Sequence, residues 1–229
     1  MSNKIAFCFC MSDQHKFVYS LLIAFLLCTL IVSIYIITSA SDFSFVQLGI
    51  HPRHLDGLPG ILTSPLVHAN INHLIDNIIP LFFLTLATFY FYYNVAFSVL
   101  LNGWILTGFW VWIGARPDAW HIGASGVIYC LASFLFFSGI IRKHPPLLAI
   151  SLLVTFLYGG MVWGILPVQT DISWESHLYG AMAGLILAYT YRSHNPQQEQ
   201  VEEVEEEEFD EEEFKESEGY SGELEDDAG

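Results

Sequence analysis

Apolar runs separated by short polar segments fill most of the chain up to residue 191. Six of these runs resemble membrane-spanning helices, with predicted ranges 18–39, 73–92, 95–114, 124–141, 147–166 and 176–191. Pro80 predicts a kink in the second helix. The fourth and sixth runs, of 18 and about 16 residues, would reach only ~27 Å and ~24 Å. We therefore expect both of these helices to begin below the membrane surface.

The pattern predicts an all-α membrane protein made of three parts. These are a cytoplasmic N-terminal segment (1–17), a six-helix membrane domain (18–192) and a disordered acidic cytoplasmic tail (193–229). Residues 40–67 form a long loop that is too apolar for disorder and is expected at the membrane interface. Basic residues favour the inner side of the membrane, which places both termini in the cytoplasm. The residues that decide this orientation are Lys4, Lys16, Arg142, Lys143 and Arg192, against Arg53 and Arg116 outside.

The net charge of −16 comes from the tail alone. Residues 199–229 hold 17 acidic residues and one basic residue, which leaves seven of each kind in residues 1–198. A basic surface for nucleic acid is therefore absent. Two interpretations of the tail stay open: a solvated, repulsive appendage, or a docking site for a basic cytoplasmic partner. The four cysteines show no disulfide framework.

Polar residues recur at the predicted outer ends of three helices. In this topology the second, fourth and sixth helices enter from outside at His73, Ser125 and His177, at similar depth. Polar groups inside a membrane are costly, and such a convergence indicates a functional site. The small residues around Ser125, taken alone, also fit close packing of two helices, and that interpretation stays open.

Helical spacing groups these residues further. His177, Gly180 and Gly184 share one helix face, and the glycines allow a close approach to the fourth helix. A serine within reach of a neutral histidine forms a nucleophile and its general base. Asp171 and Glu175 are expected beyond the end of the sixth helix, so we predict a dyad rather than a triad.

The same spacing predicts the groups that would assist the dyad. His73 and Asn77 are four residues apart on one face and would, with the Ser125 backbone N–H, donate to an oxyanion. Tyr129 lies one turn beneath Ser125, where its ring could support the His177 imidazole.

At these residues the sequence resembles the rhomboid family of intramembrane serine proteases. The similar segments are residues 68–77, residues 123–126 with Tyr129, and His177 with Gly180 and Gly184. The resemblance implies a six-helix rhomboid-like bundle in which Ser125 is the nucleophile and His177 the base. It implies that His73 and Asn77 line the oxyanion hole and that Tyr129 stacks on His177. The supporting positions would be His68, Gly123, Gly126, Gly180 and Gly184.

The activity implied is an intramembrane endopeptidase that cleaves transmembrane segments of other membrane proteins near the outer face. Such an enzyme needs water, a lipid bilayer and protein substrates, but no metal and no organic cofactor. The near-minimal chain favours a bacterial inner membrane over an organelle membrane.

The chain departs from the family pattern in two places. Many members carry a Trp-Arg pair in the first loop, and Pro59 and Gly60 stand there instead, before Thr63. This leaves open how the loop is anchored. Asp76 replaces a residue that is usually apolar, and it either faces His73 or lies in the wet interface.

Two other functions compete with the protease. An inactive relative that binds or retains membrane proteins typically lacks the serine or the histidine, and both are present here. A metal site would use His68, His73, Asp76 and His177. Against it, a spacing of five residues keeps His68 and His73 off one helix face. The remaining loop histidines are interpreted as ordinary interfacial residues; they are His51, His54, His121 and His144.

Overall fold

The computed structural model describes residues 12–41, 45–143 and 173–194, with isolated positions 145, 148, 149, 152 and 153. Most of the predicted fifth span, of the acidic tail and of the N-terminal segment therefore lies outside the described residues.

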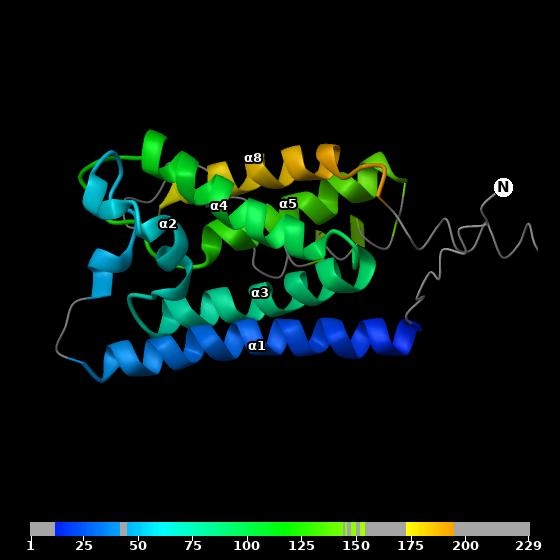
Figure 1. Ribbon diagram of the computed structural model, residues 1–229, viewed down its shortest axis with the longest axis horizontal. Helices are drawn as coiled ribbons and strands as arrows, with labels where there is room; N and C mark the ends of the chain where they lie inside the picture. The colour runs from blue at the N-terminus through cyan, green and yellow to red at the C-terminus, as the bar shows by residue number, and fades with distance from the viewer. Residues whose placement is uncertain are drawn as a thin grey trace, which may run out of the picture. The chain divides into compact units, whose positions relative to one another are not determined.

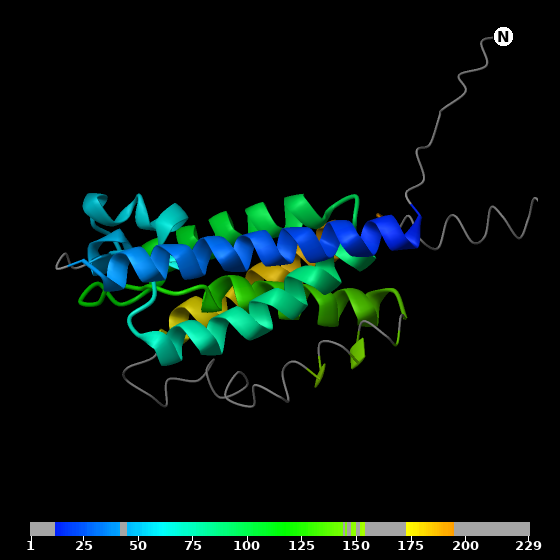
Figure 2. The same ribbon diagram turned by 90° about the horizontal axis from the view of Figure 1, so that it is seen from below.

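Five long helices run side by side along one bundle (Figures 1 and 2). They are α1 (Asp13–Ser39), α3 (Ile71–Phe91), α4 (Ala96–Gly114), α5 (Ser125–Ile141) and α8 (Trp174–Thr190). Loop 1, residues 40–67, carries four short helical segments: η1 (Phe45–Leu48), η2 (Leu55–Gly57), α2 (Gly60–Thr63) and η3 (Ser64–Leu66). The described residues form no strand beyond one isolated bridge between Ile50 and His121, so the all-α prediction is confirmed.

The helix ends agree with the predicted ranges to within two residues, except at the start of α1. That helix begins at Asp13, whereas the sequence predicts a start at residue 18. The Ser12 hydroxyl caps it by accepting a hydrogen bond from the His15 N–H at 3.4 Å. Hydropathy detects only the apolar part of a helix, and a capped polar turn can precede that part.

Among the residues that the structure describes, three helices, α1, α3 and α4, are long and apolar enough to cross a membrane. The helix α5 is apolar but has only 17 residues, and α8 also has 17. Both short helices correspond to the predicted short fourth and sixth spans.

The helix α5 lies at the centre of the bundle. It packs most extensively against α8 and also contacts α3 and α4. Residues 126–132 of α5 are all buried, as expected for a helix that is apolar on every side. Phe134 and Leu135 are fully buried further along the helix. The helix that starts at Ser125 is therefore held from several sides.

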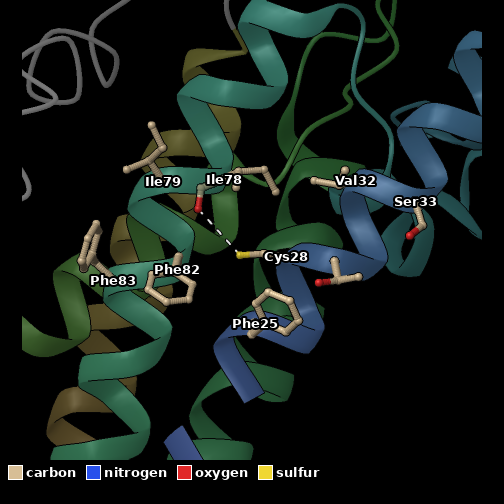
Figure 3. Close-up of a pocket in the computed structure, with 9 residues that line it drawn as sticks. Phe25, Cys28, Val32, Ser33, Ile78, Ile79, Phe82 and Phe83 are labelled. Carbon is tan, nitrogen blue, oxygen red and sulfur yellow. Dashed lines mark hydrogen bonds between the residues drawn. The ribbon is translucent and has the colours of Figure 1, made fainter. Parts of the chain in front are cut away.

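The helix α1 packs along α3 at the edge of the bundle. Between them lies an apolar groove of about 470 Å³ (Figure 3). The Cys28 thiol points across it and donates to the Ile78 carbonyl at 3.7 Å. The groove lies well along α3, apart from the candidate site described next.

The N-terminal ends of α3, α5 and α8 lie at the end of the bundle that carries loop 1 (Figure 1). Segments that are far apart in sequence thus bring His73, Ser125 and His177 to one end of the molecule. Pro80 lies within α3, which continues past it to Phe91.

Candidate active site

Two glycines of α8 set how closely this helix approaches α5. A Cβ added to Gly180 would overlap the Gly126 carbonyl, and one added to Gly184 would overlap the Cys130 carbonyl. No larger residue fits at either position without moving a helix. Because Ser125 precedes Gly126 and His177 lies one turn before Gly180, the contact holds both residues at the same end of the helix pair.

Ser125 is the first residue of α5 and is partly exposed. Its backbone N–H therefore has no acceptor within the helix and lies at the positive end of the helix dipole. The hydrogen bonds between described residues do not include one from the Ser125 hydroxyl to His177. Hydrogen bonds between catalytic residues are often longer before substrate binds, so the absence of this one is compatible with a dyad.

The turn before Ser125 depends on Gly123. Its φ of +105° is one that residues with a Cβ rarely adopt. A Cβ there would also lie 2.5 Å from the His73 Nε2. The Gly123 N–H donates to the Ser64 carbonyl at 2.8 Å, which ties this turn to loop 1. The His73 ring is consequently held directly beside the turn that leads to Ser125.

His177 is buried and lies flat against the Tyr129 ring. The ring centroids are 4.2 Å apart and the planes differ by 12°. Tyr129 comes from the second turn of α5, so the helix that carries the serine also fixes the plane of the imidazole. The stacked pair and the glycine contact together hold His177 against the first turns of α5.

His68 supports the same turn from the loop that precedes α3. It is 5% exposed, and its Nε2 accepts a hydrogen bond from the Ala124 N–H at 3.4 Å. Burial, and next the neighbouring His73, lower the pKa of His68 to about 4. The His68 and His73 rings meet edge to face, with centroids 5.0 Å apart. His68 is therefore neutral near pH 7 and acts here as an acceptor.

Asn77 lies one turn below His73 and is 3% exposed. Its Nδ2 donates to the His73 carbonyl at 2.6 Å, whereas its Oδ1 is buried without a partner among the described residues. An amide nitrogen carries two hydrogens, so a second donation remains possible. Asp76 is exposed, as expected for a residue in the wet interface, and its charge also acts on the neighbouring His73.

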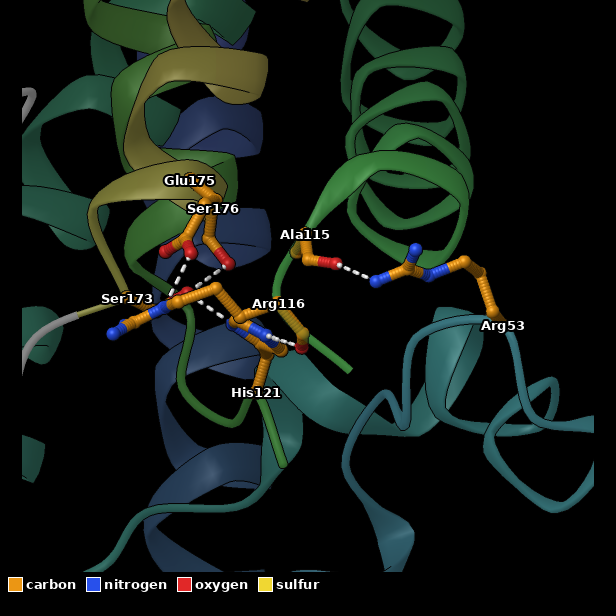
Figure 4. A network of polar contacts seen from close by, with 7 residues as sticks. All are labelled: Arg53, Ala115, Arg116, His121, Ser173, Glu175 and Ser176. Atoms are coloured by element: carbon orange, nitrogen blue, oxygen red, sulfur yellow. Dashed lines mark hydrogen bonds and ion pairs between the residues drawn. The ribbon is translucent and has the colours of Figure 1, made fainter. Parts of the chain in front are cut away.

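Sequence reasoning was wrong about Glu175. It lies in the first turn of α8, which begins at Trp174, and not beyond the helix end. The side chain is 4% exposed, and its Oε1 accepts from the Arg116 Nε at 2.6 Å (Figure 4). An ion pair with Arg116 allows a carboxylate to be buried there. In the sequence, this ion pair is indicated by the opposite charges of Arg116 and Glu175, which both stand at predicted outer helix ends.

His121 was likewise predicted as an ordinary interfacial residue, and it is 4% exposed. Its Nε2 lies 3.4 Å from the Arg116 carbonyl and must donate to it, so the Nδ1 accepts from the Ser173 hydroxyl at 2.5 Å (Figure 4). The Ser173 oxygen lies 2.6 Å from the Ser176 hydroxyl. Burial lowers the pKa of His121. This network fastens the residues before Ser125 to the start of α8, where Ser176 directly precedes His177.

Loop 1 is anchored by indole groups of α4, which answers the question raised by Pro59 and Gly60. The Trp104 Nε1 donates to the Ile61 carbonyl at 3.1 Å, and the Trp112 Nε1 donates to the His54 carbonyl at 2.9 Å. A Cβ on Gly60 would overlap the backbone of Gly49, so the small residue at this position allows the loop to fold onto itself.

The residues of the competing metal site are only partly brought together. His68 and His73 are adjacent, but Asp76 is exposed. Within the described residues, the group whose possible ligand atoms all lie within 4.8 Å of one another consists of His51, His54 and Asp56. That group lies in loop 1.

Comparison with known proteins identifies the family. The family model of the Rhomboid domain matches residues 56–194, which include all the candidate site residues. Uncharacterised proteins of Mycobacterium bovis and Mycobacterium tuberculosis are 35% identical over 176 residues, covering 70% of this chain and 72% of their own length. An uncharacterised protein of Mycobacterium leprae is 36% identical over 154 residues, covering 62% of this chain and 59% of its own. On its apolar helices and this match, the chain is a membrane protein of the rhomboid family.

Proposed function

We propose that the protein is an intramembrane serine endopeptidase that cleaves transmembrane segments of other membrane proteins near the outer membrane face. One observation supports this most strongly. Ser125, at the free N-terminus of α5, and His177, stacked on Tyr129, are held at one end of the same glycine-packed helix pair. A role in packing alone explains the glycines but gives no reason for the stacked imidazole.

In this proposal the Ser125 Oγ attacks the carbonyl carbon of the scissile peptide bond while His177 takes the hydroxyl proton. The tetrahedral intermediate then collapses, and His177 gives that proton to the departing amine nitrogen. Water, deprotonated in turn by His177, hydrolyses the acyl-enzyme and releases the carboxylic acid and the free serine. No metal or organic cofactor is needed for these steps.

The negative charge that forms on the carbonyl oxygen needs donors already in place. The Ser125 backbone N–H is one, because no residue of α5 can accept from it. The His73 imidazole, held beside Gly123, and the second Asn77 amide hydrogen are the other two. His68 would act through the Ala124 N–H by keeping the turn in position.

We further propose a bacterial inner membrane location with both termini in the cytoplasm. Transmembrane substrates with Gly, Ala or Pro near the outer face are the expected targets, because a helix must unwind locally before a backbone carbonyl can reach Ser125. A basic cytoplasmic partner for the acidic tail remains the second interpretation of that segment.

Cleavage in proteoliposomes tests the proposal. The full chain should cut a model transmembrane substrate with such residues near its outer end. Ser125→Ala and His177→Ala should each abolish cutting. The matched control is Ser133→Ala, two turns further along α5, where the hydroxyl only donates to the Ala181 carbonyl at 2.7 Å. Cleavage that survives loss of Ser125 would refute the proposal, and substrate binding without cleavage would favour the inactive relative.

A further inference from the structure

Loop 1 gathers three potential metal ligands at a place that the protease mechanism does not use. The His51 Nδ1 lies 3.2 Å from the Asp56 Oδ1, and the His51 and His54 rings stack with centroids 3.9 Å apart and planes 3° apart. Each of the three residues has one possible ligand atom, and these three atoms all lie within 4.8 Å of one another.

The backbone between the two histidines makes this arrangement. Arg53 has a φ of 63°, a left-handed conformation that is uncommon for a residue with a side chain. The reversal lets the His54 N–H donate to the His51 carbonyl at 3.2 Å and brings the two rings together. The Arg53 N–H donates to the Trp112 carbonyl at 2.8 Å, which holds the reversal against α4.

The one cation in this segment is Arg53, and it binds a backbone carbonyl. The Arg53 guanidinium donates to the Ala115 carbonyl at 3.3 Å (Figure 4). The Asp56 carboxylate lies beside the His51 imidazole.

The cluster is both positioned and accessible. The Trp120 ring stacks on His51 with centroids 4.4 Å apart, which limits rotation of that imidazole. The His51 side chain is 20% exposed and the Asp56 side chain 63% exposed, so an ion can enter from solvent.

We propose that His51, His54 and Asp56 bind one Zn²⁺ ion. Two imidazoles and a carboxylate are a donor set that suits zinc, whereas Ca²⁺ and Mg²⁺ prefer oxygen ligands alone. Tetrahedral zinc with bonds near ~2.0–2.1 Å needs nitrogen atoms about 3.3 Å apart. Binding therefore turns the exposed His54 ring out of the parallel stack, so that its ring nitrogen faces the ion beside His51. Water would complete the coordination.

A bound ion would fix the loop beside the proposed active site. Ile50, next to His51, pairs with His121 through two hydrogen bonds of 2.9 and 2.8 Å. His121 belongs to the network that precedes Ser125. Zinc should therefore stabilise the folded chain and slow tryptic cleavage after the exposed Arg53.

Zinc affinity of the full-length protein in detergent, measured by competition with a chromophoric chelator, tests the site. One Zn²⁺ per chain should bind, with protection of the bond after Arg53. His54→Ala should weaken binding by ~10-fold or more, the scale on which loss of a metal-site partner acts. His54 is exposed, so this variant should fold. His15→Ala, which removes an exposed histidine at the start of α1, is the matched control and should bind like wild type.

Asp56→Asn keeps the size of the third ligand and should also weaken zinc binding. This second variant tests the site even if His54→Ala fails to fold. Ser125→Ala should bind zinc like wild type, which separates this site from the protease proposal. Absence of saturable binding would overturn the inference. Binding that is unchanged in both His54→Ala and Asp56→Asn would overturn it too, because the ion would then lie on other histidines.

Discussion

The Tyr129 ring and the His177 imidazole stack with centroids 4.2 Å apart and planes 12° apart. Tyr129 belongs to α5 and His177 to α8, the two helices that pack most extensively against each other. The contact couples the orientation of the proposed base to the helix that carries the proposed nucleophile. Substitutions of Tyr129 can separate the effect of this contact on catalysis from its effect on helix packing.

Tyr129→Ala should lower kcat by up to ~10-fold, because an aromatic pair is worth about 0.5–1.5 kcal/mol beyond its buried area. Tyr129→Phe keeps the ring and should retain most of the rate. Both variants should be assayed by substrate cleavage at saturating substrate. Equal losses in the two variants would show that the hydroxyl, and not the stacked ring, is what matters.

His73→Ala and Asn77→Ala should each lower kcat by ~10²-fold, the lower part of the range for losing one preorganised oxyanion donor. KM should change little, because the charge they stabilise is absent from the ground state. Asn72→Ala, an exposed asparagine in the same helix, is the matched control and should keep the wild-type rate. Effects confined to KM would contradict the assignment.

Glu175→Gln should destabilise the protein. The carboxylate is buried while Arg116 is partly exposed, so we expect a loss of about 1.5–3 kcal/mol, the range for a hydrogen bond to a charged group. The measurement is the free energy of unfolding in a detergent titration. Asp118→Asn removes an exposed acid from the same loop and should change stability little. A Glu175→Gln protein as stable as wild type would mean that the ion pair does not hold the start of α8.

The buried His68 should make stability depend on pH. Its pKa is about 4 in the folded chain, against ~6.5 for an unperturbed histidine in the unfolded chain. Between these values the unfolded chain binds more protons, so the free energy of unfolding falls as the pH falls. The shifted pKa of His68 should lower the free energy of unfolding of wild type by about 2 kcal/mol when the pH falls from about 7.5 to about 5. The His68→Gln protein should lack that part of the loss, and identical pH profiles would contradict the pKa shift.

Much of the arrangement was predictable from spacing alone. Gly180 and Gly184 share a helix face with His177, and the structure packs that face on α5, because only glycine admits a carbonyl so close. The start of α5 at Ser125 follows from Gly123, whose backbone conformation ends the preceding turn. Such local rules operate within a few residues, which is why a single sequence reveals them.

The remaining features depend on partners distant in sequence. Hydropathy placed Glu175 outside its helix, because an isolated carboxylate is expensive to bury. Its partner Arg116 is in another loop, so the only indication in the sequence is the opposite charge of the two residues at predicted outer helix ends. The burial of His121 likewise depends on Ser173, which is 52 residues further along the chain. These pairings arise only when the helices assemble.

Covalent labelling of Ser125 is the most direct test of the central claim. A serine hydroxyl needs a base to accept its proton, so a fluorophosphonate should label wild type only if His177 activates it. We expect one label per chain on Ser125, none in Ser125→Ala, almost none in His177→Ala and unchanged labelling in Ser133→Ala. All variants should keep the wild-type thermal midpoint, so that unfolding does not explain a loss. Labelling at another serine, or labelling of Ser125 that is unaffected by His177→Ala, would contradict the proposed dyad.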